Sequence, residues 1–168
     1  HKTPNIEGLD NDNVFIVKNI EDADKIKKYI AENNPKNSVI IGGGFIGLEM
    51  AENLKKKGID VSIVEAGSHI LSGFDLDAAV HFEKAVKSCG INIIKNKTIK
   101  QIGAKEVTLD DFEKIAADLI IVAAGVKPNI AIAEKAGIII GETGAIKINE
   151  KLQTNIKDIY AVGDCAEN

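Results

Sequence analysis

The 168-residue chain has no tryptophan, no arginine, two cysteines and three prolines, and aromatic residues make up only 4% of it. Its net charge is −4, and its lysines are scattered except for the run Lys55 to Lys57. It therefore lacks a basic patch with interleaved aromatic residues, the feature by which proteins bind nucleic acids and anionic membranes. No apolar run approaches the ~20 residues of a membrane span, and no signal peptide is apparent. We expect no nucleic-acid and no membrane partner.

The cysteines, Cys89 and Cys165, lie far apart and form no C-x-x-C pair, so neither a redox dithiol nor a zinc site is predicted. His69 and His81 stand alone, and no metal site is expected. Free cysteine is among the most buried residue types, which predicts that both thiols pack in the core. Reduced thiols of this kind fit a cytoplasmic setting.

The most informative segment is a short apolar strand, Val39 to Ile41, followed by Gly-x-Gly-x-x-Gly at Gly42, Gly44 and Gly47. An amphipathic helix comes next, then a second strand over 61–64 that ends at the acid Glu65. This order is typical of a dinucleotide-binding unit. A glycine-rich turn that binds nothing would leave the acid after the second strand unexplained.

Each glycine has a distinct expected role. Gly42 permits a tight turn, Gly44 lacks the Cβ that would block a pyrophosphate, and Gly47 allows close packing of helix on strand. The first-turn N–H groups and the helix dipole then attract the phosphates. Helical spacing predicts that the residues facing the sheet are Ile46, Met50 and Leu54.

Glu65 also bears on the choice of cofactor. Its carboxylate can accept both hydroxyls of an adenosine ribose, but it repels a 2′-phosphate by about 4 kcal/mol at 4 Å before desolvation and screening. The chain has no arginine to clamp a 2′-phosphate, although Ser68 and His69 offer hydrogen bonds to one. We therefore expect NAD(H), with NADP(H) disfavoured.

The remaining patterns predict an α/β fold: a Rossmann-like parallel sheet with helices on one or both faces. Helices are expected over 21–32, after the glycines, over 75–88 and over 130–136, and strands over 14–17, 91–94 and 119–123. Three short segments, 98–102, 106–109 and 112–116, indicate an inserted antiparallel meander.

Three segments resemble the pyridine-nucleotide disulfide oxidoreductases, flavoproteins with two dinucleotide-binding domains. Residues 40–51 resemble the NAD(P)H-binding loop, residues 119–129 a second glycine-containing segment, and residues 154–164 the FAD-contacting segment. The lead-in Asn13-Val14-Phe15, with residues 22–26, resembles the branch of NADH oxidases, NADH peroxidases and coenzyme A-disulfide reductases.

The resemblance implies that Glu49 sits by the nicotinamide, that Gly125 lets the backbone pass close to the cofactor, and that Asp164 contacts the FAD ribityl chain. From the residues alone, Glu49 also fits a solvated helix position, and Gly125 and Asp164 fit simple turns. The predicted cofactor-binding residues are Gly42, Gly43, Gly44, Phe45, Ile46, Gly47, Glu49, Glu65, Gly125 and Asp164.

An intact enzyme of this kind would also have an FAD fingerprint, an upstream redox cysteine and a dimerisation domain, none of which is in these 168 residues. Together with the first residue, His1, this suggests a piece of a larger flavoenzyme, inactive alone, whose missing FAD and dimerisation domains are its partners. The expected segments are 1–19, a remnant of the FAD domain; 20–150, the NAD(P)H-binding domain; and 151–168, a second FAD-domain remnant. No catalytic residue is predicted within the chain.

Other classes of dinucleotide-binding or nucleotide-binding protein account for fewer of these motifs. A short-chain dehydrogenase needs Tyr-x-x-x-Lys, which neither Tyr29 nor Tyr160 provides. A methyltransferase usually has another glycine spacing and has no use for the segment ending at Asp164. A regulatory NAD-sensing domain explains the fingerprint and Glu65 but not the two later segments, and it stays as the alternative.

The absence of a second glycine fingerprint predicts that the purified chain is colourless. An absorption spectrum should show no flavin band, and heat denaturation should release no flavin fluorescence. A stoichiometric flavin spectrum would contradict the view that the chain lacks an FAD domain.

Overall fold

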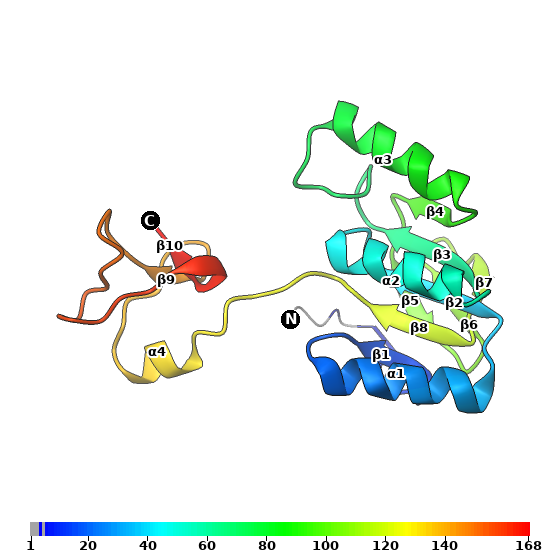
Figure 1. Cartoon of the computed structure of the whole chain (residues 1–168), viewed down its shortest axis with the longest axis horizontal. Helices are drawn as coiled ribbons and strands as arrows, with labels where there is room; N and C mark the ends of the chain where they lie inside the picture. The colour runs from blue at the N-terminus through cyan, green and yellow to red at the C-terminus, as the bar shows by residue number, and fades with distance from the viewer. Residues whose placement is uncertain (1–3, 5) are drawn as a thin grey trace. The chain divides into compact units, whose positions relative to one another are not determined.

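A computed structural model describes residue 4 and residues 6–168 of the chain. They fall into two compact units, one running to Gly125 and the other from Val126 to Asn168. Both are drawn in Figure 1, and each is described by itself. The predicted segments divide the chain elsewhere, after residues 19 and 150. Their assignment to domains of a larger protein stays a prediction.

The first unit is built on a parallel sheet of five strands in the order β1-β8-β2-β3-β4. All five strands come from the apolar runs recognised in the sequence, and the central strands β2 and β8 are almost completely buried. The strands are β1 (Val14–Ile16), β2 (Asn37–Ile41), β3 (Asp60–Glu65), β4 (Asn92–Lys95) and β8 (Leu119–Val122).

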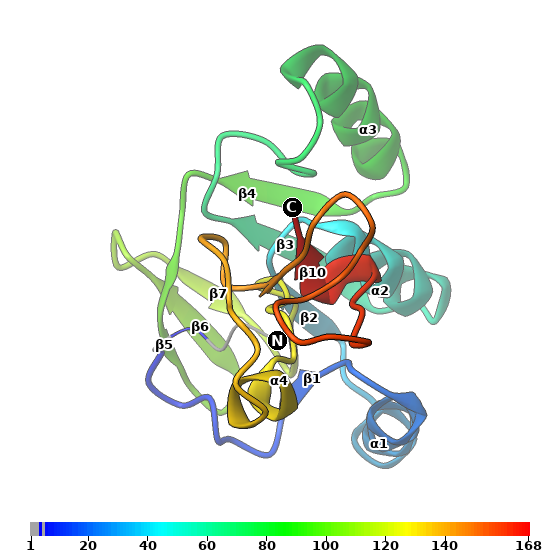
Figure 2. The same ribbon diagram turned by 90° about the vertical axis from the view of Figure 1, so that its left-hand side faces the viewer.

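Three helices lie on one face of this sheet, as Figure 2 shows: α1 (Ile20–Asn33), α2 (Phe45–Lys56) and α3 (Leu76–Ser88). Asn19 caps α1 by accepting a hydrogen bond from the Asp22 N–H at 2.9 Å. A core on this face joins Ile26 of α1 and Leu54 of α2 to Ile40, Ile63 and their strand neighbours.

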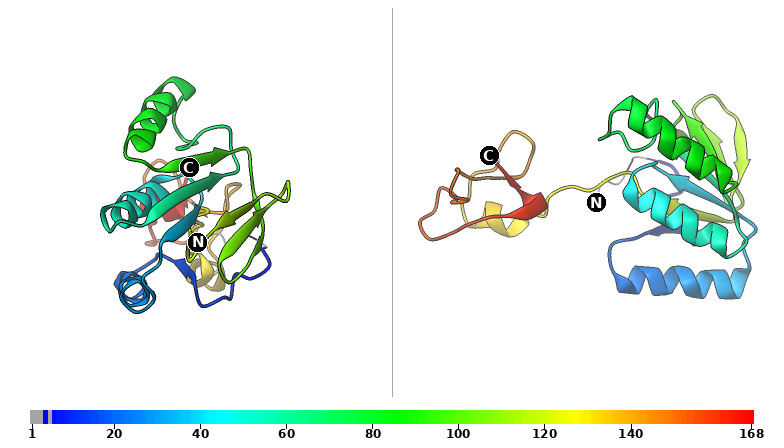
Figure 3. Two further views of the ribbon diagram at one scale, coloured as in Figure 1. Left: turned by 90° about the vertical axis from the view of Figure 1, so that its right-hand side faces the viewer. Right: turned by 45° about the horizontal axis from the view of Figure 1, so that its top comes forward.

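The opposite face is covered by an antiparallel three-stranded sheet, β5 (Ile99–Ile102), β6 (Glu106–Leu109) and β7 (Lys114–Ala116). A second core forms between the two sheets, where Val107 and Leu109 meet Val39 and Val122. The left-hand view of Figure 3 shows this meander across the parallel sheet from the helices. The predicted α/β sheet with an inserted meander is confirmed, with helices on one face only.

The predicted inner face of α2 is partly wrong. Leu54 is buried and Met50 is half-buried, but Ile46 is 40% exposed. The residues of α2 that are buried against the sheet are Gly47, Ala51 and Leu54. The small size of Gly47 and Ala51 lets the helix lie close to the strands. Ile46 belongs to the first turn, at the edge of the sheet.

Helix α3 buries few of its apolar side chains, although Val86 packs against the core. Val80 is 40% exposed and Ala85 is exposed, whereas the buried positions are Ala79 and Glu83. The Glu83 carboxylate accepts two hydrogen bonds from Lys95 Nζ, at 2.9 and 3.0 Å. This pairing ties α3 to the edge strand β4 and satisfies a carboxylate that would be costly to bury alone.

The second unit contains α4 (Ala131–Lys135), the parallel pair β9 (Ile146–Lys147) and β10 (Ala166–Glu167), and the short 3₁₀ turn η1 (Gly163–Cys165). Ala133, Ile146 and Ala161 form its small core. The Glu167 carboxylate accepts hydrogen bonds from Thr143 and from the Ala145 N–H, and these bonds lower its pKa.

Asp118, just before β8, joins the starts of two central strands. Its carboxylate accepts hydrogen bonds from the N–H groups of Lys36 at 2.9 Å and Asn37 at 3.0 Å, and these bonds hold its pKa below the usual value. A lowered folded-state pKa means that this stabilisation is present above the unfolded pKa and is lost as the pH falls through the folded one.

We therefore expect Asp118→Ala to lower the free energy of unfolding by about 1–2 kcal/mol at pH 7. The difference from the unaltered chain should shrink as the pH falls below ~4, where the unfolded state binds the proton, and vanish once the folded state binds it too. Urea unfolding at pH 7 and pH 3 tests this. Asp24→Ala is the control, because Asp24 makes only an exposed pair with Lys27. An Asp118 effect that persists unchanged at pH 3 would refute the explanation.

Candidate functional site

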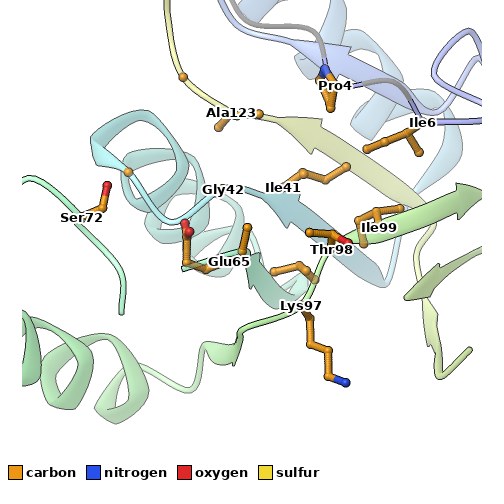
Figure 4. Close-up of a pocket in the computed structure, with 15 residues that line it drawn as sticks. Pro4, Ile6, Ile41, Gly42, Glu65, Ser72, Lys97, Thr98, Ile99 and Ala123 are labelled. Atoms are coloured by element: carbon orange, nitrogen blue, oxygen red, sulfur yellow. The ribbon is translucent and has the colours of Figure 1, made fainter. Parts of the chain in front are cut away.

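A crevice of about 500 Å³ lies at the carboxyl ends of β8, β2 and β3 (Figure 4). Ala123 to Gly125 line it after β8, Gly42 and Gly44 after β2, and Glu65 after β3. Open parallel sheets bind ligands at this edge, and the volume is that of a small-molecule site. The structure thus brings the glycine turn, Glu65 and Gly125 together in one crevice, and their binding of a cofactor stays a prediction.

The glycine turn is fixed by contacts with its own protein. Gly42 has a φ of +107°, and a Cβ there would lie 2.5 Å from the Ala123 carbonyl oxygen. A Cβ on Gly47 would lie 2.1 Å from the Gly42 carbonyl oxygen. These two glycines are required by the fold, which agrees with the tight turn and close packing expected of them.

Gly44 is different, because no described protein atom lies within 4 Å of the position of its Cβ. It is the N-cap residue of α2, and it lines the crevice. No side chain within the described structure caps this helix end. Its first-turn N–H groups and dipole suit an anion, so the open space beside Gly44 has room for a diphosphate.

The Glu65 carboxylate is hydrogen-bonded to two loops. Oε2 accepts a hydrogen bond from the Gly43 N–H at 2.7 Å, and Oε1 accepts one from the Gly67 N–H at 2.7 Å. A carboxylate has about four lone-pair sites, so acceptor capacity remains for hydroxyl groups of a ligand. Gly43 is buried, and a Cβ there would meet Ile70 at 2.6 Å.

Phe45 and Ile46 begin α2 and are exposed, at 67% and 40%. Phe45 packs edge to face on Phe74, which packs in the same way on Phe82, with ring centroids 5.9 and 5.7 Å apart. These residues therefore form an apolar surface at the first turn of α2. Their predicted contact with a cofactor stays a prediction.

Glu49 is exposed, and it lines a second groove, of about 640 Å³, between α2 and α3. It does not line the crevice that contains Gly42 and Glu65. Asp164 lies exposed in η1 of the second unit. The roles implied for Glu49 at the nicotinamide and for Asp164 at FAD stay predictions.

The sequence reading missed several residues of the crevice, including Ile6, Ala66, Ser72, Lys97 and Thr98. Lys97 and Thr98 lie in the segment between β4 and β5, and β4 is the neighbour of β3 in the sheet. Their position after the expected strand over 91–94 was the signal that could have found them. Lys97 forms an ion pair with Asp111 at 2.5 Å, which raises the pKa of Lys97 and lowers that of Asp111.

The predicted burial of Cys89 is wrong: its side chain is exposed beside the α2–α3 groove. Cys89 is the C-cap residue of α3, and the buried residues of that helix are Ala79 and Glu83, farther toward its start. Cys165 is half-buried and packs against the small core of the second unit.

Across residue 4 and residues 6–168, no three His, Cys, Asp or Glu side chains gather into a possible metal site. No helix in that part of the chain could cross a membrane.

The sequence profile of the family described as "Pyridine nucleotide-disulphide oxidoreductase" matches residues 1–168. The chain belongs to this family. It is 46% identical over 168 residues to an NADH oxidase of Methanocaldococcus jannaschii, covering 98% of this chain and 37% of that relative. The chain thus spans little more than a third of the length of that relative.

Solved structures give the same result. Reduced Bacillus anthracis CoADR-RHD superposes with a TM-score of 0.92 at 35% identity, covering 98% of this chain and 30% of that one. An engineered water-forming NADPH oxidase bound to NADPH, a mutant of the Lactobacillus brevis NADH oxidase, has a TM-score of 0.83 at 25% identity. The match covers 98% of this chain and 37% of that one.

The geometry of Gly44 predicts a separation of function from stability. Gly44→Ala should fold with a midpoint of thermal unfolding close to that of the unaltered chain, because its Cβ meets no protein atom. The same methyl group should weaken NADH binding at least tenfold, because it projects into the diphosphate space.

Gly73→Ala is the matched control, since a Cβ at Gly73 also meets no described protein atom and Gly73 does not line the crevice. Titration calorimetry and thermal unfolding of the three proteins give the comparison. Undiminished NADH affinity in Gly44→Ala would show that the diphosphate lies elsewhere.

Proposed function

We propose that the chain is the NAD(H)-binding domain of an FAD-dependent oxidoreductase. The observation that carries this proposal is the open space at Gly44, which faces an uncapped helix N-terminus and lies in one crevice with the Glu65 carboxylate. Backbone N–H groups there suit the diphosphate, and the acid suits the adenosine ribose. The family match over the whole chain supports the same assignment.

The parent enzyme would pass hydride from NADH to flavin and then reduce a disulfide, oxygen, peroxide or an electron carrier. The dinucleotide supplies the hydride, and the residues of this chain bind and orient it. Gly42 and Gly47 fix the turn, Gly44 admits the diphosphate, and Gly125 lines the crevice after β8. We propose that Glu49 and Asp164 act only in the presence of the flavin domain.

The preference for NADH follows from charge. Glu65 is held in the crevice by two backbone N–H groups, so its carboxylate stays beside the ribose hydroxyls and would face a 2′-phosphate. The repulsion expected at such a distance corresponds to more than a tenfold difference in affinity, even after it is halved by screening.

The engineered relative supports this view. Its substitutions replace an aspartate by alanine and the next alanine by arginine, and the protein is an NADPH oxidase. The replaced aspartate follows a replaced glycine at the same spacing by which Glu65 follows Gly47. Glu65 and Ala66 of this chain match that pair, and both line the crevice.

We expect the unaltered chain to bind NADH at least tenfold more tightly than NADPH, and the double variant Glu65→Ala/Ala66→Arg to reverse that order. Titration calorimetry with both dinucleotides measures the ratio. The ratio is the decisive quantity because loss of the Glu65 hydrogen bonds also loosens the glycine turn and weakens both ligands.

The matched control is Glu52→Ala/Asn53→Arg, which makes the same change of charge on the exposed face of α2. It should leave the ratio unchanged. Equal affinities in the unaltered chain would disprove the role of Glu65, and no binding of either dinucleotide would disprove the proposed function.

A regulatory NAD-sensing domain remains the second candidate. It would share the crevice and the preference for NADH. The family match favours the flavoenzyme, because it includes the region of Asp164, which a sensor would not need.

A further inference from the structure

The wall of the crevice beyond Glu65 belongs to the segment that follows β4. If the diphosphate lies at Gly44 and the ribose at Glu65, the chain of the ligand crosses the sheet from β2 to β3. The base then lies on the side of β4, where Lys97 and Thr98 line the crevice (Figure 4). This placement rests on the proposed function.

Backbone hydrogen bonds join the segment after β4 to Glu65 and the loop that follows it. The Lys97 N–H donates to the Glu65 carbonyl oxygen at 3.2 Å, and the Asn96 N–H donates to the Gly67 carbonyl oxygen at 3.0 Å. These two bonds continue the pairing of β3 with β4. They end at residue 97, so they do not hold Thr98.

Thr98 is held instead by the turn between β6 and β7. Asp110 Oδ2 accepts hydrogen bonds from the Thr98 hydroxyl at 3.0 Å and from the Thr98 N–H at 3.2 Å. The Asp110 N–H donates in return to the Thr98 carbonyl oxygen at 3.0 Å. All three polar groups of Thr98 are thus bound by one residue of the meander.

We propose that Asp110 is a positioning residue for the adenosine half of the dinucleotide. It contacts no ligand itself, but it fixes Thr98 and, through the chain, the wall against which the base packs. This gives the meander a second task besides covering the sheet, because its turn sets the shape of the crevice twelve residues earlier in the chain.

The neighbouring residue provides a contrast. Asp111 binds the same segment through the Lys97 ammonium group, in one ion pair whose side chains are 31% and 41% accessible. Both aspartates lie at the surface, but one ion pair on a long lysine side chain contributes little to position, whereas Asp110 makes three hydrogen bonds to the short Thr98. If the turn acts through Asp110, the two adjacent aspartates should differ in their effect on binding.

The experiment measures binding of NADH by calorimetry and of two partial ligands, 5′-AMP and inorganic pyrophosphate, by ¹⁵N NMR titration of the 168-residue chain. Asp110→Ala should weaken NADH and AMP by about three- to tenfold, as the loss of one or two hydrogen bonds allows. Pyrophosphate, which would contact only the glycine turn, should bind as before.

Three further variants separate positioning from stability. Asp110→Asn keeps an oxygen that can accept both bonds from Thr98, and it should restore most of the AMP affinity. Asp111→Ala should change AMP affinity less than twofold. Thr98→Val removes only the hydroxyl bond while keeping the branched shape, and it should weaken AMP even if Asp110→Ala fails to fold.

Equal losses for AMP and pyrophosphate in Asp110→Ala would overturn the inference, as would equal effects of Asp110→Ala and Asp111→Ala on AMP. In either case NADH binding by the unaltered chain would leave the proposed function standing. If the unaltered chain bound neither NADH nor AMP, the proposed function would fail and this inference with it.

Discussion

The hydrogen bonds of the Glu65 carboxylate join the two loops that form the crevice. One oxygen holds the glycine turn at Gly43, and the other holds the loop after β3 at Gly67. Gly43 is held further by the Leu71 N–H, which donates to its carbonyl oxygen at 2.9 Å. The turn is therefore shaped before any ligand arrives, and little backbone entropy remains to be lost on binding.

Much of the architecture was predictable, because it follows from short-range patterns. The continuous apolar run at Leu119–Val122 indicated a strand buried on both faces, and it is completely enclosed. Short segments with polar breaks indicated the meander. The glycine spacing located the turn that lines the crevice, since Gly47 packs against the Gly42 carbonyl oxygen, a steric demand that is local in sequence.

The errors arise where burial depends on distant neighbours. Ile46 has the right helical spacing for the core, but its turn projects beyond the edge of the sheet. Glu83 is buried because Lys95 from β4 reaches it, a pairing that periodicity does not reveal. The contact of Asp110 with Thr98 lies beside the pair of Ile99 and Leu109, where β5 begins and β6 ends, and a polar side-chain bond of this kind is not visible in a hydrophobic pattern.

Strand β1 precedes the glycine fingerprint, yet it pairs with β8 in register from Val14 to Ile16. Tyr29 of α1 packs edge to face on Phe15 of β1 and donates a hydrogen bond to the Asp118 carbonyl oxygen at 2.9 Å, so that it covers the same edge of β8. A shorter gene product that began at the fingerprint itself would leave the flank of Leu119–Val122 without a partner. Such an open apolar strand favours self-association, so the smallest soluble unit of this fold must include β1, which does not line the crevice.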